Sequence, residues 1–209
     1  MTPTPWFRDG QLGWAASDGE RDDQIAAARR LEGLRITRVH YFTLDYKHLD
    51  LSYLPEGPRV VTDPIELANS PCRYDDFDSV DFYIQIESID QRSFTIGWDP
   101  PSETEGLWVR EGVTSGEPFA SNTRVAVWDV TDSRRWSSSI GRVVSEIGLH
   151  YRQTAQPAGW GCDLLTLVIG GKNLSVFLGD VGEMNSMKPS ANNLLVITSP
   201  TQAPEWIVP

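Results

Sequence analysis

The stretch DFYIQIESIDQRSFTIGWD, residues 81–99, indicates the fold class of this chain of 209 residues. Apolar and polar side chains alternate on both sides of the link Asp90-Gln91-Arg92, which is the pattern of a β-hairpin with half-buried strands. We predict strands over Val80–Ile89 and Ser93–Asp99, with the numbers of facing residues adding up to about 182. The alternation places one set of side chains in the core, namely Phe82, Ile84 and Ile86. The other set should face outward, namely Asp81, Tyr83, Gln85 and Glu87.

Most of the chain on either side of this hairpin also has the composition of β-strands. The segments are rich in β-branched and aromatic residues and are separated by turn residues. Further strands are expected at Arg35–Tyr46, Gly106–Arg110, Thr123–Asp129, Val143–Tyr151, Cys162–Ile169, Leu174–Gly179 and Leu194–Thr198. The run Gly170-Gly171-Lys172-Asn173 predicts a tight hairpin turn, because glycine adopts positive φ without steric cost.

Two segments predict short helices. SDGERDDQIAAARRLEG begins with acids, places Ile25, Ala28 and Leu31 at roughly helical spacing, and ends at Gly33, so we expect a helix near residues 20–32. The second segment is Asp63-Pro64-Ile65-Glu66-Leu67-Ala68, with Asp63 as the N-cap and proline at the first helical position.

The strand pattern occurs twice along the chain. Residues 34–111 and residues 123–199 each give a strand, a hairpin and a further strand, and an acid closes each hairpin at Asp99 and Asp180. We therefore predict an α+β protein that is predominantly β, with two similar antiparallel sheet units packed together and one or two short helices. Residues 1–209 should form a single globular unit, whose two halves are either an internal duplication or two meandering sheets with a common pattern.

The second half carries a layout of residues that resembles a protein family. Trp136 is followed by IGRVVSEIGLHY, by GWGCDLLTLVIGGKNLSVFLGD and by PSANNLLVITS, within about residues 125–199. This layout, W…L.L.I…V.I.LG-[DE]…P..LLV, resembles the C-terminal part of uncharacterised bacterial proteins of actinobacterial type. The resemblance implies a β-rich domain and assigns no catalytic residue. In size and charge, such proteins are similar to the small cytoplasmic partners of secreted bacterial toxins. This similarity is an analogy in general properties and not in sequence motifs.

The net charge of −11 limits the possible partners. Residues 45–111 hold 15 acids and 5 bases, so this one segment carries almost the whole imbalance. Such a charge argues against nucleic acid and anionic membranes as direct ligands. The N-terminal MTPTPWFRDG lacks the features of a signal peptide, and Cys72 and Cys162 have no metal-binding or redox spacing. We therefore expect a cytoplasmic protein with free thiols.

No local motif predicts catalysis or a bound cofactor. The sequence has no glycine-rich phosphate loop, no GxSxG and no HExxH, and its three histidines, His40, His48 and His150, are far apart. The acids of residues 75–81 lack the glycine and terminal glutamate of a calcium loop. We expect neither a cofactor nor a metal.

The acids themselves are the candidate site. If the predicted hairpin holds, the loop that enters it and the loop DPPSETEG that leaves it meet at the same end. The two loops carry the candidate partner-binding residues Asp75, Asp76, Asp78, Asp99, Glu103 and Glu105. An acidic surface of this kind attracts a basic partner, although a solvated cluster that only aids solubility has the same composition.

These observations lead to a functional hypothesis with two alternatives. The hypothesis is a cytoplasmic binding protein, namely an immunity protein that inhibits a basic bacterial toxin by covering its active site. The first alternative is a hydrolase whose catalytic Asp and His come from separate strands. The second is a structural or regulatory β-domain.

Overall fold

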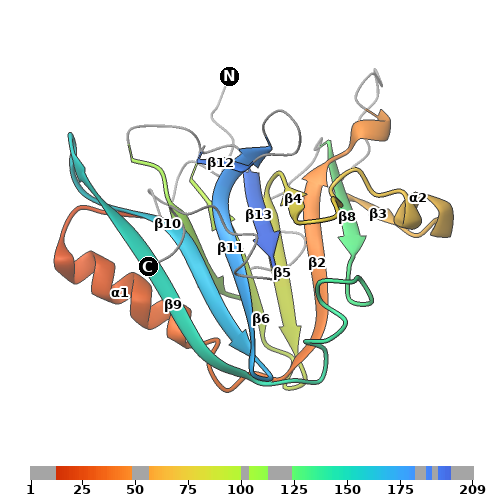
Figure 1. The fold of residues 1–209 in the computed structure, drawn as a ribbon, viewed down its shortest axis with the longest axis horizontal. Helices are drawn as coiled ribbons and strands as arrows, with labels where there is room; N and C mark the ends of the chain where they lie inside the picture. Colours follow the sequence, from red (N-terminus) through yellow and green to blue (C-terminus); the bar gives the residue numbers. More distant parts are fainter. Residues whose placement is uncertain are drawn as a thin grey trace.

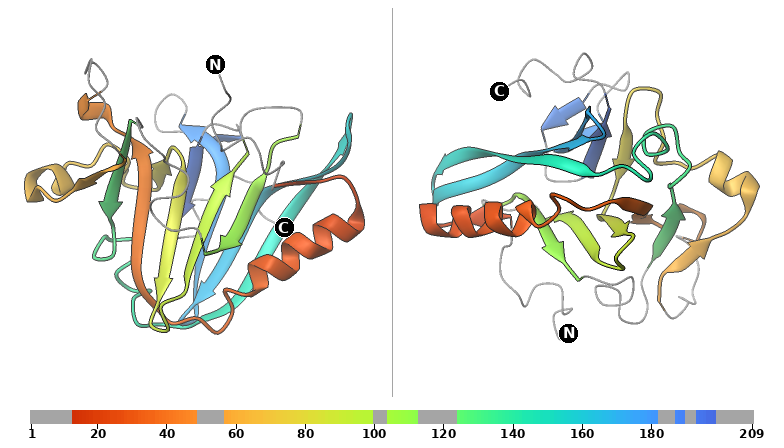
Figure 2. Two further views of the ribbon diagram at one scale, coloured as in Figure 1. Left: turned by 180° about the vertical axis from the view of Figure 1, so that it is seen from behind. Right: turned by 90° about the horizontal axis from the view of Figure 1, so that it is seen from below.

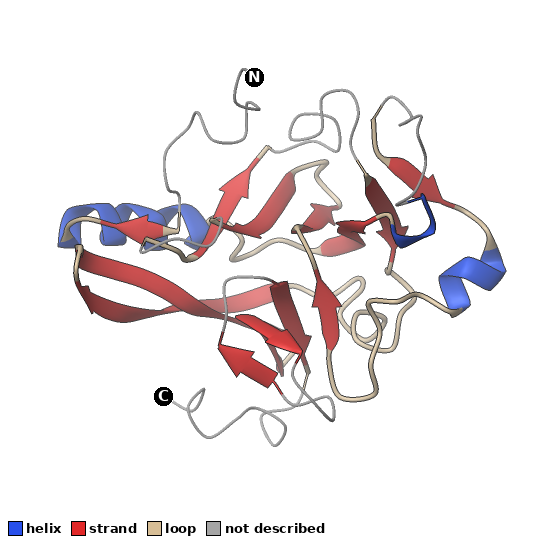
Figure 3. Cartoon of the chain, turned by 90° about the horizontal axis from the view of Figure 1, so that it is seen from above, coloured by secondary structure: helices blue, strands red, loops and turns tan. Residues whose placement is uncertain are grey.

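The computed structural model describes residues 13–48, 57–99, 104–112, 124–181, 187–189 and 193–198. Over these residues the chain is mostly β, with two sheets and two short helices (Figure 1). The sheets lie face to face as two layers (Figure 2), and the helices lie at opposite ends of the sandwich (Figure 3). This arrangement confirms the predicted fold class.

The N-terminal sheet has six strands in the order β3-β8-β2-β5-β6-β7. Its strands are β2 (Ile36–Leu44), β3 (Arg59–Val61), β5 (Tyr83–Ser88), β6 (Ser93–Trp98), β7 (Leu107–Glu111) and β8 (Val125–Asp129). Neighbouring strands are antiparallel except β3 and β8, which run parallel.

The C-terminal sheet has seven strands in the order β1-β10-β11-β13-β4, with β9 paired to β10 and β12 paired to β11. Its strands are β1 (Trp14–Ala15), β4 (Asp78–Val80), β9 (Val144–Ala155), β10 (Ala158–Ile169), β11 (Lys172–Val181), β12 (Met187–Pro189) and β13 (Asn193–Ile197). The turn between β10 and β11 has positive φ at both Gly170 and Gly171, as the sequence predicts.

The hairpin of β5 and β6 forms with a register two residues away from the prediction. Ile84 faces Ile96 and Ile86 faces Phe94, so that facing numbers add up to 180. Because the shift is even, every side chain keeps its face of the sheet. Ile84 and Ile86 are fully buried, which confirms the predicted core face. On the opposite face Gln85 is also buried, contrary to a simple solvent-facing alternation.

The predicted strand Val80–Ile89 is in fact two strands in different sheets. β4 pairs with β13 in the C-terminal sheet, whereas β5 begins at Tyr83 and pairs with β2 and β6 in the N-terminal sheet. The chain therefore crosses between the layers at Asp81 and Phe82. Phe82 does not reach the main core, and it packs instead against a small separate cluster of Phe42, Val125 and Val127.

One continuous core lies between the sheets. It takes side chains from both layers, for example Tyr41 and Ile86 from the N-terminal sheet and Leu165 and Val196 from the C-terminal sheet. Trp136, in the connection from β8 to β9, belongs to the same core and is completely buried.

Both helices form within the segments that the sequence indicates, although the first begins two residues and ends three residues earlier than the predicted range 20–32. Helix α1 (Asp18–Arg29) has Ser17 as its N-cap and is followed by Gly33 at positive φ. It packs on β7 and β9 and closes that end of the sandwich (Figure 2). Helix α2 (Pro64–Ala68) is capped by the Asp63 carboxylate, which accepts a hydrogen bond from the amide of Ile65.

The two halves of the chain have matching topologies. Strands β2-β5-β6-β7 and strands β9-β10-β11-β13 are each neighbours in that order, and each set contains one central hairpin. Two strands depart from this division, since β4 of the first half joins the C-terminal sheet and β8 of the second half joins the N-terminal sheet. An internal duplication stays a prediction.

Candidate functional site

The four aspartates of residues 75–81 lie in three different environments. Asp75 and Asp76 are exposed on the loop that precedes β4. Asp78 lies in β4 and is only 3% exposed, and Asp81 is half-buried where the chain crosses between the sheets. The run is therefore not one acidic surface, and each environment has its own physical explanation.

Asp78 belongs to a buried network that joins three parts of the fold. Its carboxylate accepts a hydrogen bond from the Tyr41 hydroxyl at 2.9 Å and forms an ion pair with Arg135 Nε at 3.1 Å. Trp136 Nε1 donates to the Tyr41 hydroxyl at 2.6 Å. Burial raises the pKa of Asp78, although the charge of Arg135 opposes this shift. The predicted role of Asp78 in an exposed acidic surface is wrong, because its carboxylate is enclosed by these partners.

The acids after the hairpin lie elsewhere. Asp99 is 5% exposed, and its carboxylate accepts a hydrogen bond from the amide of Gly13 at 2.7 Å. Glu105 is half-buried and lies 4.0 Å from Arg152 of β9. Glu103 lies outside the described residues.

The predicted meeting of the two acidic loops depends on one continuous strand from Val80, and that strand does not exist. Asp75 and Asp76 precede β4, whereas Asp99 and Glu105 are held near Gly13 and β9. Hairpin geometry therefore does not bring the two loops together.

Asp81 opens onto a small polar pocket, which we call the acidic pocket. Its volume is about 280 Å³. The residues that line it come from the start of the 3₁₀ turn Tyr46–His48, the loop before β4, β4 itself and the ends of β11 and β13. They are Tyr46, Pro71, Cys72, Tyr74, Ser79, Asp81, Asp180 and Asn193.

Neutral donors position the two carboxylates of the acidic pocket. Asp81 accepts hydrogen bonds from the Leu44 amide at 2.8 Å and from the Tyr46 hydroxyl at 2.9 Å. Asn193 Nδ2 lies 3.3 Å from Asp180 Oδ1 and donates to it. Burial raises the pKa of Asp81, and the negative charge of Asp180 adds to the shift. The two carboxylates are therefore close enough to interact.

The chemistry of the acidic pocket is that of an acceptor for positive charge. Among the described residues that line it are two carboxylates, and none of these described residues is a lysine, arginine or histidine. In the strand register Lys188 of β12 is opposite Asp180, so one basic residue belongs to the neighbouring strand. Burial raises the pKa of the Cys72 thiol to about 12, and a thiol that stays protonated is a poor nucleophile.

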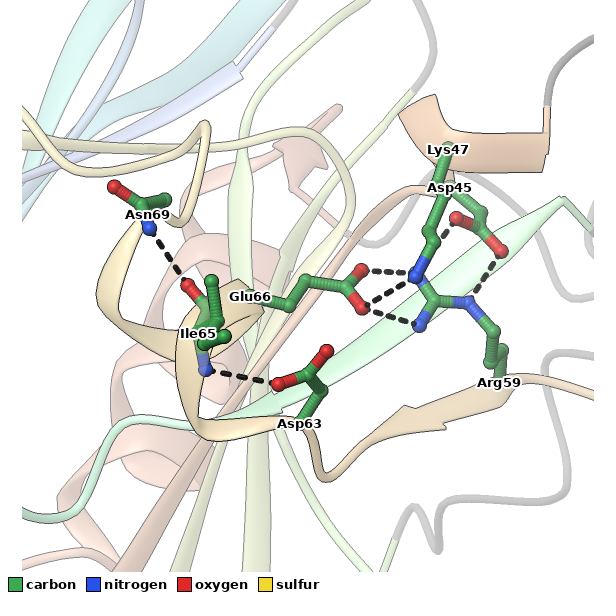
Figure 4. Close-up of polar contacts among 7 residues, drawn as sticks. All are labelled: Asp45, Lys47, Arg59, Asp63, Ile65, Glu66 and Asn69. Atoms are coloured by element: carbon green, nitrogen blue, oxygen red, sulfur yellow. Dashed lines mark hydrogen bonds and ion pairs between the residues drawn. The ribbon is translucent and has the colours of Figure 1, made fainter.

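An ion network holds the turn that carries Tyr46 (Figure 4). Arg59 of β3 forms hydrogen bonds with Asp45 at 2.8 Å and with Glu66 of α2 at 2.6 Å, and Lys47 also reaches Glu66. These bonds raise the pKa of Arg59 and lower the pKa of Glu66. Asp45 and Lys47 flank Tyr46 in the chain, so the network fixes the turn that carries this lining residue.

Within the described ranges, no three His, Cys, Asp or Glu side chains come close enough together to hold a metal ion. The same part of the chain contains no helix with the length and apolar character needed to cross a membrane.

Together, the fold and the acidic pocket define a β-sandwich protein with a small carboxylate-lined cavity at one end. No family model matches the chain, and no curated protein or solved structure matches it either. The resemblance of residues 125–199 to bacterial β-rich proteins therefore stays a prediction.

Sequence reasoning missed the acidic pocket for an identifiable reason. Asp81 has the position of an outward-facing strand residue, and its pairing with Tyr46 depends on a contact 35 residues away. Asp180 stood out only as the acid that closes the second hairpin, and Asn193 lies in the PSANNLLV part of the family layout. Both residues stand in the family layout, but no spacing within that layout indicates that they line the same cavity.

Proposed function

We propose that this chain is a binding protein that inhibits a basic protein partner, as a cytoplasmic immunity protein inhibits its toxin. The observation that carries the proposal is the acidic pocket with its two carboxylates, Asp81 and Asp180. Its lining residue Tyr74 is followed directly in the chain by the exposed Asp75 and Asp76. These four residues replace the six acids that the sequence suggested as the contact surface.

Charge and rigidity both support binding at this place. Exposed carboxylates speed the association of an oppositely charged protein, and carboxylates in a recess lose less interaction energy to solvent than those on an open surface. Asp81 and Asp180 are already oriented by hydrogen bonds from Leu44, Tyr46 and Asn193. A partner that binds here meets acceptors that are already oriented, so binding costs less ordering entropy.

Inhibition then needs only occupancy. A partner whose active site is basic, such as an enzyme that acts on nucleic acid, presents cationic side chains that a carboxylate-lined surface can cover. The inhibitor supplies no catalytic group in this account. A toxin must be neutralised in the cell that makes it, so we also propose a cytoplasmic location.

The proposal can be tested with the toxic C-terminal domain of a secreted protein encoded beside this gene. We expect co-expression of the chain to restore growth, and the purified pair to associate more slowly as salt increases. Replacing Asp75 and Asp76 by asparagine should slow association, whereas the matched pair Asp22 and Asp23 on α1 should not. A growth arrest that the chain does not relieve, with no complex at low salt, would refute the proposal.

A second candidate, a hydrolase, rests on one observation. Asp81 and Asp180 are two carboxylates in one cavity, and burial raises the pKa of Asp81, which is typical of a carboxyl that acts as a general acid. Purified protein should then cleave p-nitrophenyl glycosides with a bell-shaped pH profile, and Asp180→Asn should abolish turnover. Absence of turnover over pH 4–8 would remove this candidate.

A further inference from the structure

We propose that the acidic pocket receives a single arginine side chain of the partner. This inference rests on the proposed function and specifies the chemistry of the contact. Three properties of the cavity carry it, namely its size, its hydrogen-bonding groups and its aromatic lining.

The size of the cavity fits one side chain. Pockets for drug-sized molecules have volumes of roughly 300–1,000 Å³. The acidic pocket has about 280 Å³, just below that range, so it suits one long side chain better than a larger metabolite.

The hydrogen-bonding groups match a guanidinium. Asp81 and Asp180 are acceptors with their orientation fixed from the protein side. A guanidinium has five N–H donors in a planar fork and no acceptor, so it can bond to two carboxylates at once. A lysine ammonium carries the same charge on one atom and lacks this planar fork.

The aromatic lining distinguishes this cavity from an acidic patch. Tyr46 and Tyr74 both line it. Arginine stacks on tyrosine rings through cation–π contact, and it does so more often than lysine in protein structures. Two rings and two carboxylates around one cavity therefore favour a flat cation over a round one.

The test uses three small probes and the full-length protein. N-acetyl-arginine amide, N-acetyl-lysine amide and the neutral isostere N-acetyl-citrulline amide are titrated while amide resonances are followed by NMR. We expect the arginine probe to shift the amides of Leu44, Asp81 and Asn193, the lysine probe to bind several-fold more weakly, and the citrulline probe to cause no shift.

Two variants locate the binding. Asp180→Asn should weaken the arginine probe by about tenfold, because a charge-assisted hydrogen bond is lost. Tyr46→Leu should weaken it by about two- to fivefold, because it removes both the ring and the hydroxyl that orients Asp81. Tyr46 is 49% exposed, so this second variant is expected to fold even if the first does not. Asp23→Asn on α1 removes one charge at a distance and serves as the control.

The outcomes separate the two proposals. No shift with arginine, equal shifts with citrulline, or equal weakening by Asp23→Asn would each overturn the arginine inference. If the toxin domain still binds and its affinity is unchanged by Asp180→Asn, the inference fails while the proposed function stands. If arginine binds as expected and no toxin complex forms, only the proposed function fails.

Discussion

Replacing Arg135 by methionine should destabilise the protein strongly and in a pH-dependent way. Arg135 is 4% exposed and its Nε lies 3.1 Å from the buried carboxylate of Asp78. It also donates to the backbone carbonyls of Tyr74 and Asp75 at 2.7 and 3.1 Å. Methionine fills much of the same volume but leaves Asp78 without its ion-pair partner, and the charge of Arg73 is then the one that still favours the ionised carboxylate.

The expected loss follows from the cost of an uncompensated buried charge. Removing one partner of a buried ion pair costs about 3–5 kcal/mol. For a protein of this size, 1 kcal/mol corresponds to roughly 2–4 °C in Tm, so the melting temperature should fall by roughly 6–20 °C. Chemical denaturation and differential scanning calorimetry measure both quantities.

The loss should be larger at pH 7.5 than at pH 5. A carboxyl whose pKa is raised by folding stabilises the protein fully below its unfolded pKa, and this contribution is lost as pH rises through the folded pKa. Burial raises the pKa of Asp78, and Arg135 opposes the shift. Without Arg135 the folded pKa rises further, so the variant carries the penalty of an ionised Asp78 mainly at neutral pH.

Two further variants make the argument refutable. Arg134→Met removes the same charge from the exposed neighbouring residue and should change stability by less than about 0.5 kcal/mol. Adding Asp78→Asn to Arg135→Met should restore part of the lost stability, because the buried charge is then removed as well. A loss under about 1 kcal/mol, or an equal loss at both pH values, would refute the reasoning.

Three other substitutions or reactions have expected outcomes. Ser17→Ala removes the hydroxyl that accepts a hydrogen bond from the Glu20 amide in the first turn of α1 at 3.3 Å. The free energy of unfolding, measured in urea, should fall by about 1 kcal/mol. No change would mean that the cap does not stabilise the helix. Gly97→Ala places a methyl group against the rings of Trp108 and Tyr83. The free energy of unfolding should fall by about 1–3 kcal/mol, and the near-UV circular dichroism spectrum should change. An unchanged stability would show that these two rings can move aside. Cys72 and Cys162 should resist thiol reagents at pH 8 until urea unfolds the chain. Both thiols are buried, and burial raises the pKa of Cys72 to about 12. Rapid labelling of the native protein would contradict this prediction.

The sequence predicts those features of the fold that are local. Alternation places Ile84 and Ile86 in the core, and paired glycines at residues 170 and 171 specify a two-residue turn. The register of the first hairpin was off by two because its turn is centred one residue earlier than the Asp90–Arg92 link suggests. An even shift preserves the face of each side chain, so the error does not change the core.

The features that the sequence did not predict are long-range. Asp78 and Asp81 look alike in the sequence, yet one is enclosed by Tyr41 and Arg135 and the other lines a cavity with Asp180. These environments depend on the crossing of the chain between two sheets, and no periodicity within residues 75–88 marks that crossing. Composition alone can locate excess charge, but it cannot tell buried acids from exposed ones.

The exchange of β4 and β8 between the sheets makes the two halves of the chain inseparable. A cut between β7 and β8 would leave the first fragment with β4 but without its partner β13, and the second fragment with β8 but without β2. Each fragment would carry an unpaired edge that fits the other, so the two should assemble together as a split protein rather than fold alone. In the intact chain the same exchange of strands couples the layers, and the amide protons of β8, which lies between β2 and β3, should exchange with solvent only when the whole molecule unfolds.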